Sequence, residues 1–357
     1  MLAKKIFYLR LENKDVTRGA VFSMAGIQDV AKKAGVGIGT VSRVINNNGY
    51  VSEETRQKVE RAIEELNYTP NEIARNLIQN RTNIIAIIVP DVAYPFFADL
   101  TSEIEKSLRE YGYKAMICNT SEQQSNEQAY LDMLTRNMVD GILTATHSLN
   151  NENYLKIHKP IVSFDTIEVY GEIPVITVNH KKGGKMAAQE LLDAGCHKII
   201  QFRDMEMPEH FSFFERHEEF ERVVKKSDAE CINVYVKWND FDNSNTENYV
   251  EECLRKYPDA DGIFATDTTV LRYMKMAQLR GVKIPEQLKL VAYDGSSIID
   301  TAFPTVTVVA QPIKKLARSG VKLLIDIING KKPDKYRICH SVKLIKGMTT
   351  SINERNK

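Results

Sequence analysis

The segment that most constrains the fold of this chain runs from Ile27 to Asn48, with the sequence IQDVAKKAGVGIGTVSRVINNN. Its first half places apolar residues at the i, i+3, i+4, i+7 spacing of one helical face, namely Ile27, Val30, Ala31 and Ala34. Gly35 predicts the end of that helix, because glycine accepts left-handed backbone angles that other residues resist. The second half of the segment then predicts another helix, which begins within three residues of Gly35.

The second predicted helix has an apolar and a polar side. Apolar spacing recurs at Val41, Val44 and Ile45, and Val36 can fill the angle between the two helices. The polar side carries Thr40, Ser42, Arg43 and Asn46. Two short helices joined by a tight glycine turn form a helix-turn-helix, whose second helix lies in the major groove of DNA. An ordinary helical hairpin with a solvated face shows the same spacing, so the pattern alone leaves both interpretations open.

A third helix is predicted from Ser52 onward. Ser52 can cap it, and Glu53 and Glu54 favour its positive end. Its buried stripe would consist of Val59, Ala62, Ile63 and Leu66. Pro70 ends this helix, and the segment after it is too short to hold a helix unaided.

Three successive stretches, DVAKKAGVGIGTVSRVINN, VSEETRQKVERAIEELNYTPN and IARNL, resemble the DNA-binding headpiece and hinge of the LacI/GalR family of bacterial transcription regulators. The resemblance implies DNA contacts from Ile38, Gly39, Thr40, Ser42, Arg43, Asn46, Tyr50, Asn71, Ala74, Arg75 and Leu77. Ile38 and Gly39 match the positions that set base choice in the family, and Arg43 is expected to bind guanine through O6 and N7. Leu77 matches a side chain that wedges between base pairs in the minor groove, so the hinge is expected to fold only on DNA.

Length and composition limit the function independently. The 357 residues, 43% of them hydrophobic, suffice for two or three domains of about 100–200 residues each. Charge is balanced, with 48 basic and 47 acidic residues, so composition alone does not indicate DNA binding. The five cysteines lie far apart without a CxxC pair, which favours reduced thiols in a cytosol and argues against a metal site. No apolar run approaches the ~18 residues of a membrane span, so we expect a soluble, cytoplasmic protein.

Residues 1–23 precede the headpiece and are expected to be a disordered extension. Arg10 and Glu12 interrupt the apolar run of this stretch too early for a secretory signal. Met24 falls just before the point at which family members usually begin, so Met1 and Met24 both remain candidate starts.

Beyond the hinge the sequence alternates between apolar strands and amphipathic helices. IIAIIVP, YKAMIC, VDGILT and KPIVSFD form one series of strands, and HKIIQF, CINVYV, DGIFAT and LKLVAYD form another. Such alternation predicts parallel sheets covered by helices. The predicted fold is therefore a small all-α headpiece followed by an α/β core of two doubly wound parallel-sheet lobes, resembling periplasmic binding proteins. The expected boundaries are 1–23, 24–69 for the headpiece, 70–83 for the hinge and linker, and 84–357 for the core.

The resemblance extends over the core and implies an effector site between its lobes. Ligands of open α/β sheets bind beyond the carboxyl ends of the strands. By resemblance and by strand-end position, the expected effector-binding residues are Tyr94, Phe96, Asp165, Arg216, Trp238, Phe241, Thr266, Asp294 and Gln311. Two carboxylates and a guanidinium suit a polyhydroxylated ligand, on whose ring an aromatic residue can pack. The alternative is that the strand-end aspartates cap helices and that the aromatic residues belong to the core.

Two positions depart from the family pattern. Glu219 stands where the family has a glycine, three residues after the effector-binding arginine, and Gly347 stands where it has an arginine. These departures suggest a shifted effector chemistry.

Enzymatic functions find little support in the sequence. The chain has no GxSxG, GxxxxGK[ST] or HExxH motif, and no cofactor is expected. Gly183 and Gly184 follow a predicted strand and precede a helix, where they could cradle a phosphate or allow close helix packing.

The expected protein is a homodimeric repressor that binds a pseudo-palindromic operator and responds to a small sugar or sugar phosphate. AYDG, QPIKKLA and IPVITVNH resemble repressors of the sucrose-operon type most closely. The rival is a sugar-binding receptor without regulatory DNA binding, which would have no use for Ile27 to Leu77.

Overall fold

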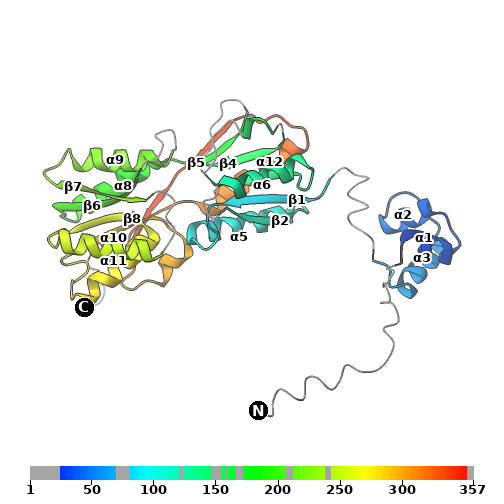
Figure 1. Ribbon diagram of the computed structural model, residues 1–357, viewed down its shortest axis with the longest axis horizontal. Helices are drawn as coiled ribbons and strands as arrows, with labels where there is room; N and C mark the ends of the chain where they lie inside the picture. Colours follow the sequence, from blue (N-terminus) through cyan, green and yellow to red (C-terminus); the bar gives the residue numbers. More distant parts are fainter. Residues whose placement is uncertain are drawn as a thin grey trace, which may run out of the picture. The chain divides into compact units, whose positions relative to one another are not determined.

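A computed structural model gives the structure of the chain (Figure 1). It describes residues 25–69, 81–120, 124–146, 154–157, 159–165, 172–205, 212–237 and 243–351. The chain divides into two compact units, Met1–Gln79 and Asn80–Lys357, and each is described by itself below.

The first unit contains three helices, α1 (Ile27–Ala34), α2 (Ile38–Ile45) and α3 (Glu53–Glu65). Gly35 ends α1 with a φ angle of 67°, as the sequence predicted. The Ser52 hydroxyl caps α3 by accepting a hydrogen bond of 3.4 Å from the Thr55 amide. The buried core holds the predicted apolar residues Val30, Ala31, Val41, Val44, Val59 and Ala62.

The second unit begins with a lobe that we call the N-lobe, built on a fully parallel sheet of strand order β11-β5-β4-β3-β1-β2. Its strands are β1 (Ile84–Val89), β2 (Lys114–Asn119), β3 (Gly141–Thr144), β4 (Ile161–Phe164), β5 (Val175–Val178) and β11 (Arg337–His340). Its helices are α5 (Pro95–Glu110), α6 (Gln124–Thr135) and α12 (Ile313–Ile328).

The second lobe, the C-lobe, has a sheet of order β12-β10-β9-β8-β6-β7, in which only β12 runs antiparallel. Its strands are β6 (Lys198–Met205), β7 (Glu230–Lys237), β8 (Gly262–Thr266), β9 (Lys289–Asp294), β10 (Thr307–Ala310) and β12 (Lys343–Ile345). Its helices are α8 (His180–Asp193), α9 (Phe214–Val224), α10 (Asn243–Lys256), α11 (Asp267–Leu279) and the 3-10 helix η1 (Ser297–Thr301). The predicted alternation of strands and helices is confirmed in both lobes.

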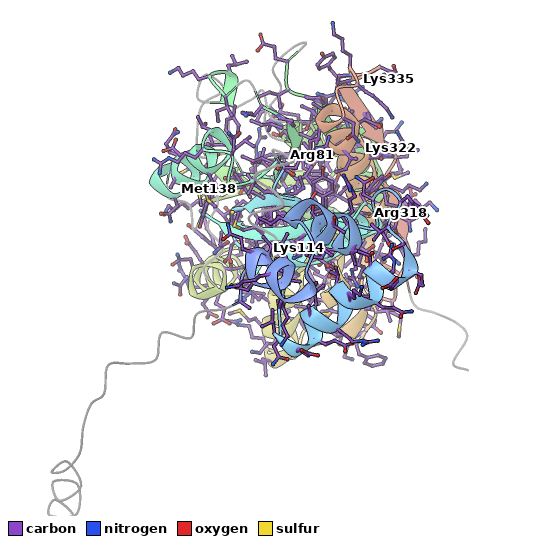
Figure 2. All side chains as sticks on the ribbon, turned by 90° about the vertical axis from the view of Figure 1, so that its right-hand side faces the viewer. Arg81, Lys114, Met138, Arg318, Lys322 and Lys335 are labelled. Carbon is purple, nitrogen blue, oxygen red and sulfur yellow. The ribbon has the colours of Figure 1, made fainter. Side chains whose placement is uncertain are left out.

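The chain passes between the lobes more than once, which the sequence did not predict. After β10 it returns to the N-lobe as α12 and β11, and it then re-enters the C-lobe as β12. One face of α12 buries Leu316 and Leu324, while Arg318 and Lys322 lie on its exposed face (Figure 2).

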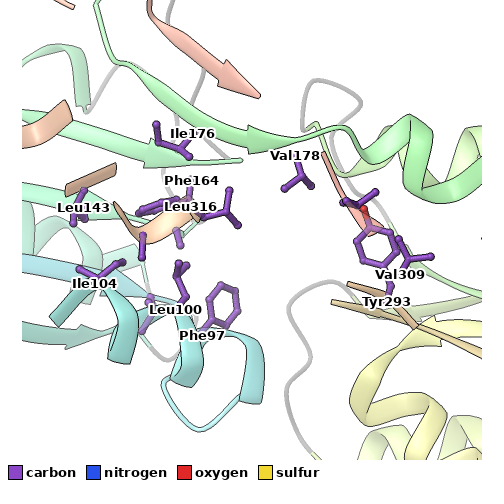
Figure 3. Packing of buried hydrophobic residues seen from close by; sticks show 14 of the residues in the cluster. Phe97, Leu100, Ile104, Leu143, Phe164, Ile176, Val178, Tyr293, Val309 and Leu316 are labelled. Atoms are coloured by element: carbon purple, nitrogen blue, oxygen red, sulfur yellow. The ribbon is translucent and has the colours of Figure 1, made fainter. Parts of the chain in front are cut away.

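A single apolar cluster extends through both lobes. It joins Leu100, Phe164 and Leu316 of the N-lobe to Tyr293 and Val309 of the C-lobe (Figure 3). Phe164, which ends β4, and Tyr293, which precedes the last residue of β9, therefore belong to one packed core.

The glycine pair of the sequence lies inside the first turns of α8. A Cβ atom on Gly184 would come within 2.0 Å of the Arg216 carbonyl oxygen, and one on Gly183 within 2.7 Å of the Tyr293 hydroxyl. The pair permits α8 to pack closely on α9 and β9, so helix packing explains it, and the expectation that it precedes the helix was wrong.

Within the described ranges, no helix is both long and apolar enough to cross a bilayer.

Candidate functional site

The surface of α2 presents the side chains expected to face DNA. Ile38 is 47% exposed, and Gly39, Arg43 and Asn46 are also exposed, while Thr40 and Ser42 are half-buried. Tyr50, which follows α2, is 92% exposed. The Asn46 side-chain amide donates a hydrogen bond of 2.9 Å to the Ser42 carbonyl, which orients it on the helix.

Arg43 forms no ion pair with any residue of the described headpiece. Its guanidinium is therefore available to a partner outside the headpiece core. The other predicted DNA-binding residues, Asn71, Ala74, Arg75 and Leu77, lie outside the described residues, as do the predicted effector-binding residues Trp238 and Phe241.

Two strands, one in each lobe, end at an aspartate with a left-handed backbone. Asp165 directly follows β4 and has a φ angle of 61°, and Asp294 ends β9 with a φ angle of 104°. Such angles cost energy in residues other than glycine, and they cluster at functional sites. Both carboxylates belong to the carboxyl ends of parallel strands, where the sequence predicted an effector site.

The carboxylate of Asp165 is held by the protein itself. Its Oδ1 accepts hydrogen bonds from the hydroxyls of Thr177 and of Ser212 (3.0 Å for Ser212), and it lies 3.1 Å from Nε2 of His180. Burial opposes ionisation, but the charge and hydrogen bond of His180 and the two hydroxyls outweigh it and lower the pKa of Asp165.

His180 links the two lobes. Because a carboxylate only accepts hydrogen bonds, Nε2 of His180 donates to Asp165. The other ring nitrogen, Nδ1, lies 3.0 Å from the hydroxyl of Tyr293, a residue of β9. The His180 and Tyr293 rings are also stacked, with centroids 5.9 Å apart.

Arg216 and Gln311 surround the second carboxylate. The Arg216 guanidinium lies 3.9 Å from Oδ1 of Asp294 and 4.6 Å from the centre of the Tyr293 ring. Gln311 donates a hydrogen bond of 2.9 Å from Nε2 to Asp294. Burial raises the pKa of Asp294, and Arg216 only partly offsets that effect.

These contacts join four of the predicted effector-binding residues into one network. We call the set Asp165, His180, Tyr293, Arg216, Asp294 and Gln311 the inter-lobe network. The Oε1 atom of Gln311 is buried and has no hydrogen-bond partner among the described residues. The network therefore offers an acceptor that a bound molecule could satisfy.

Three further predicted effector-binding residues are described, namely Tyr94, Phe96 and Thr266. The Tyr94 hydroxyl, whose pKa is raised by burial, accepts a hydrogen bond of 3.4 Å from Thr268, which joins α5 of the N-lobe to α11 of the C-lobe. Phe96 is half-buried and packs edge-on against Phe97, 5.4 Å away. Thr266 occupies the N-cap position of α11 without a side-chain capping hydrogen bond, and its hydroxyl lies 3.2 Å from that of Thr269.

Comparison with known proteins decides the family. The model of bacterial regulatory proteins of the lacI family matches residues 26–71, and the periplasmic binding protein-like domain matches residues 188–350. The chain is 36% identical to the ribose operon repressor of Halalkalibacterium halodurans, over 94% of this chain and 99% of that relative. It is also 36% identical to the sucrose operon repressor of Pediococcus pentosaceus, over 90% of this chain and 98% of that relative.

The chain belongs to the LacI family of bacterial regulatory proteins. A solved structure supports the same assignment for the core of this LacI-family protein. It is the periplasmic binding protein/LacI transcriptional regulator from Alkaliphilus metalliredigens in complex with D-xylulofuranose, with 29% identity and a TM-score of 0.66, covering 75% of this chain and 98% of that one. The predicted family and fold are confirmed, and the enzymatic alternatives are excluded because the family consists of regulators.

Several functional candidates of this LacI-family protein were missed from the sequence. Asp267 directly follows β8, and His180 lies two residues after the end of β5, so a search of strand ends, which selected Asp165 and Asp294, would also have found them. Asp267 accepts hydrogen bonds from the Gly295 amide (3.2 Å) and from the amide and hydroxyl of Ser296 (both 2.6 Å). Burial and the neighbouring Asp294 raise the pKa of Asp267 to about 7.

The two departures from the family pattern have local explanations. Glu219 is buried and forms an ion pair with Arg222 on its own helix, which lowers the pKa of Glu219. A Cβ atom at Gly347 would lie 2.5 Å from the Thr305 carbonyl oxygen, so the backbone leaves no room there for an arginine.

Proposed function

We propose that this LacI-family protein is a repressor of a carbohydrate-utilisation operon whose operator affinity is controlled by a small sugar or sugar phosphate. The observation that carries the proposal is the inter-lobe network, which places two carboxylates, a guanidinium and an unsatisfied amide oxygen together. Charge-assisted hydrogen bonds from such groups suit the adjacent hydroxyls of a sugar. The names of the relatives, repressors of ribose and sucrose operons, agree with this assignment.

In this proposal the effector contacts Asp165, Arg216, Asp294, Thr266 and Gln311. The second oxygen of each aspartate, Oδ2, has no hydrogen-bond partner within the described ranges, so it can accept from a hydroxyl of the ligand. Tyr94 and Phe96, with Trp238 and Phe241, supply the apolar wall against which a sugar ring packs.

On DNA, α2 enters the major groove, and Arg43 binds a guanine in each half of a pseudo-palindromic operator. The protein acts in the cytoplasm as a homodimer, whose two-fold symmetry matches that of the site. The proposed division is a headpiece at 24–69, a hinge and linker at 70–83 and a core at 84–357. The structural division between Gln79 and Asn80 falls inside the proposed linker.

The DNA part of the proposal is tested with a duplex selected from genomic fragments by the purified protein. Arg43→Ala should weaken binding by roughly 1–3 kcal/mol and relax the preference at one base of each half-site. Arg61→Ala, which removes an exposed arginine of α3, serves as the control and should keep the sequence preference. Equal weakening by Arg43→Ala on every sequence would instead identify a phosphate contact.

The effector part is tested by operator release in the presence of sugars. Arg216→Ala should abolish release by the effector while operator affinity without effector stays within about twofold of wild type. Arg222→Ala is the control, because Arg222 is an exposed arginine of the same helix that pairs with the buried Glu219. A normal effector response in Arg216→Ala would remove this residue from the proposed site.

A further inference from the structure

The inter-lobe network contains two carboxylates, those of Asp165 and Asp294, and one permanently charged cation, the Arg216 guanidinium. Asp204, at the carboxyl end of β6, interacts electrostatically with the same Arg216. The neighbouring His217 adds no positive charge, because burial and the charge of Arg216 hold its pKa well below the ordinary value. The charge of Arg216 therefore acts on Asp294, 3.9 Å away, and also on Asp204.

The hydrogen-bonding capacity of the site points in the same direction. The unpartnered Oε1 atom of Gln311 is an acceptor, so it requires a donor from the bound molecule. A hydroxyl can donate to Gln311 and to the carboxylates, and it can also accept from Arg216. A phosphate monoester carries a charge of about −1.5 to −2 at pH 7 and offers almost only acceptors, so the carboxylates would repel it.

We infer that the effector is an uncharged polyhydroxyl molecule, a free sugar, and that the site excludes phosphorylated sugars. This inference rests on the proposed function and narrows it, since that function admits both classes.

Isothermal titration calorimetry of the full chain tests the inference with matched pairs. The probes are ribose, fructose and sucrose, each compared with ribose 5-phosphate, fructose 6-phosphate or sucrose 6-phosphate. We expect at least one free sugar to bind at least tenfold more tightly than its phosphate. Asp204→Asn removes a negative charge, and it should reduce the ratio of free-sugar affinity to phosphate affinity at least threefold. Asp193→Asn, at the exposed end of α8, should leave this ratio unchanged.

The possible results distinguish failure of this inference from failure of the proposed function. A phosphate that binds more tightly than its parent sugar and releases operator overturns the inference and leaves the proposed function standing. If no free sugar and no phosphate binds while the protein still holds operator, the proposed sugar control fails and the inference fails with it.

A second inference comes from different contacts, those of α5 with the C-lobe. Asp99 of α5 uses both carboxylate oxygens on Ser297, the first residue of η1. The Ser297 amide donates to Oδ2 at 2.6 Å, and its hydroxyl donates to Oδ1 at 2.9 Å. An N-lobe side chain thus caps a C-lobe helix.

This cap is connected to the inter-lobe network by a short piece of chain. Ser297 is three residues beyond Asp294, and the intervening Gly295 and Ser296 are fixed by Asp267. A shift of Asp294 on ligand binding therefore moves Ser297 relative to Asp99. We propose that Asp99 is a positioning residue, a latch that couples occupancy of the network to the arrangement of the lobes.

Distances between spin labels test the latch in the ligand-free protein, and operator release tests it in the presence of effector. The labels are placed at Glu110→Cys in the N-lobe and Lys283→Cys in the C-lobe, both exposed, in a Cys339→Ser background because Cys339 is also exposed. Asp99→Ala should broaden the inter-lobe distance distribution, and it should change the effector concentration for half-maximal operator release at least threefold. The control Asp91→Ala removes a carboxylate that accepts only from the nearby Ala93 amide among the described residues, and it should behave as wild type.

Asp99→Asn keeps an acceptor for the Ser297 amide and should give an intermediate result, which separates the latch from a folding defect. A distance distribution and a half-release concentration both equal to wild type in Asp99→Ala would overturn the proposal.

Discussion

The two lobes end one strand each in an aspartate with the same unusual backbone, but their surroundings act on the two carboxylates in opposite ways. Asp165 in the N-lobe receives hydrogen bonds from two hydroxyls and from His180, and its pKa is lowered. Asp294 in the C-lobe receives one from Gln311 and lies 3.9 Å from Arg216, and its pKa is raised by burial.

Both carboxylates are proposed to contact the effector through Oδ2, but only Asp165 is also stabilised in its ionised form by the surrounding protein. Ionised Asp165 is stabilised by the folded protein, so it contributes to stability and fixes His180 between the lobes. Arg216 and Gln311 only partly offset the cost of burying the charge of Asp294, so ionised Asp294 lowers the stability of the fold. Its carboxylate can therefore accept further hydrogen bonds from a ligand. The comparison therefore predicts that substitutions at the two sites have different main effects.

The largest effect is expected for the stability of the Asp165→Ala variant. Removing the carboxylate takes the acceptor from Nε2 of His180 and leaves the hydroxyls of Thr177 and Ser212 to donate to neutral carbonyl oxygens instead. Hydrogen bonds to charged groups contribute about 1.5–3 kcal/mol each. We expect the free energy of unfolding, measured in urea at pH 7, to fall by about 3 kcal/mol.

In the wild type, the contribution of Asp165 should also disappear as the pH falls below the ordinary value of 3.8 toward the lowered folded-state pKa. Asp259→Ala, which breaks an exposed pair with Lys198, is the control and should cost at most about 1 kcal/mol. A loss in Asp165→Ala no larger than in this control would contradict a structural role.

The next effect in size is on ligand binding in Asp294→Asn. The substitution keeps the shape of the side chain but removes its charge, and we expect effector affinity to fall about 30-fold, or about 2 kcal/mol. The free energy of unfolding should stay equal or rise, because a buried charge is no longer desolvated. Asp300→Asn, at an exposed position of η1, should change neither quantity. Unaltered effector affinity in Asp294→Asn would contradict the proposed difference between Asp165 and Asp294.

The smallest effect is the pH dependence of the unfolding free energy that is due to Asp267, the neighbour of Asp294. Its folded-state pKa of about 7 lies above the ordinary value of 3.8, so the folded protein holds the proton more tightly than the unfolded chain. The resulting stability is fully present below about pH 4 and is lost as the pH rises through 7. Between pH 6 and pH 8 the wild type should lose about 1 kcal/mol of unfolding free energy that Asp267→Asn does not lose. Parallel pH profiles for the two proteins would show that Asp267 is already ionised at pH 6.

Short-range patterns predicted the headpiece in detail. Gly35 ended α1, Ser52 capped α3, and the apolar spacing named the core residues, because each of these features depends on neighbours within a few positions of the chain. The alternation of strands and helices in the core was predicted for the same reason. The path of α12 and β11 back to the N-lobe was not, since strand order depends on packing between distant segments.

For the candidate site, the sequence by itself determined the chemical groups at the strand ends, among them Asp165, Asp294 and Gln311. The tertiary structure alone decided how those groups are used. It brings His180 into contact with Tyr293, 113 positions away in the sequence. It also gives Asp165 hydrogen-bond donors from His180 and two hydroxyls, whereas Asp294 receives a side-chain donor from Gln311 and lies 3.9 Å from Arg216. The physical reason is that a residue's type fixes its charge and hydrogen-bonding capacity, whereas its burial and partners depend on which distant strands and helices pack around it.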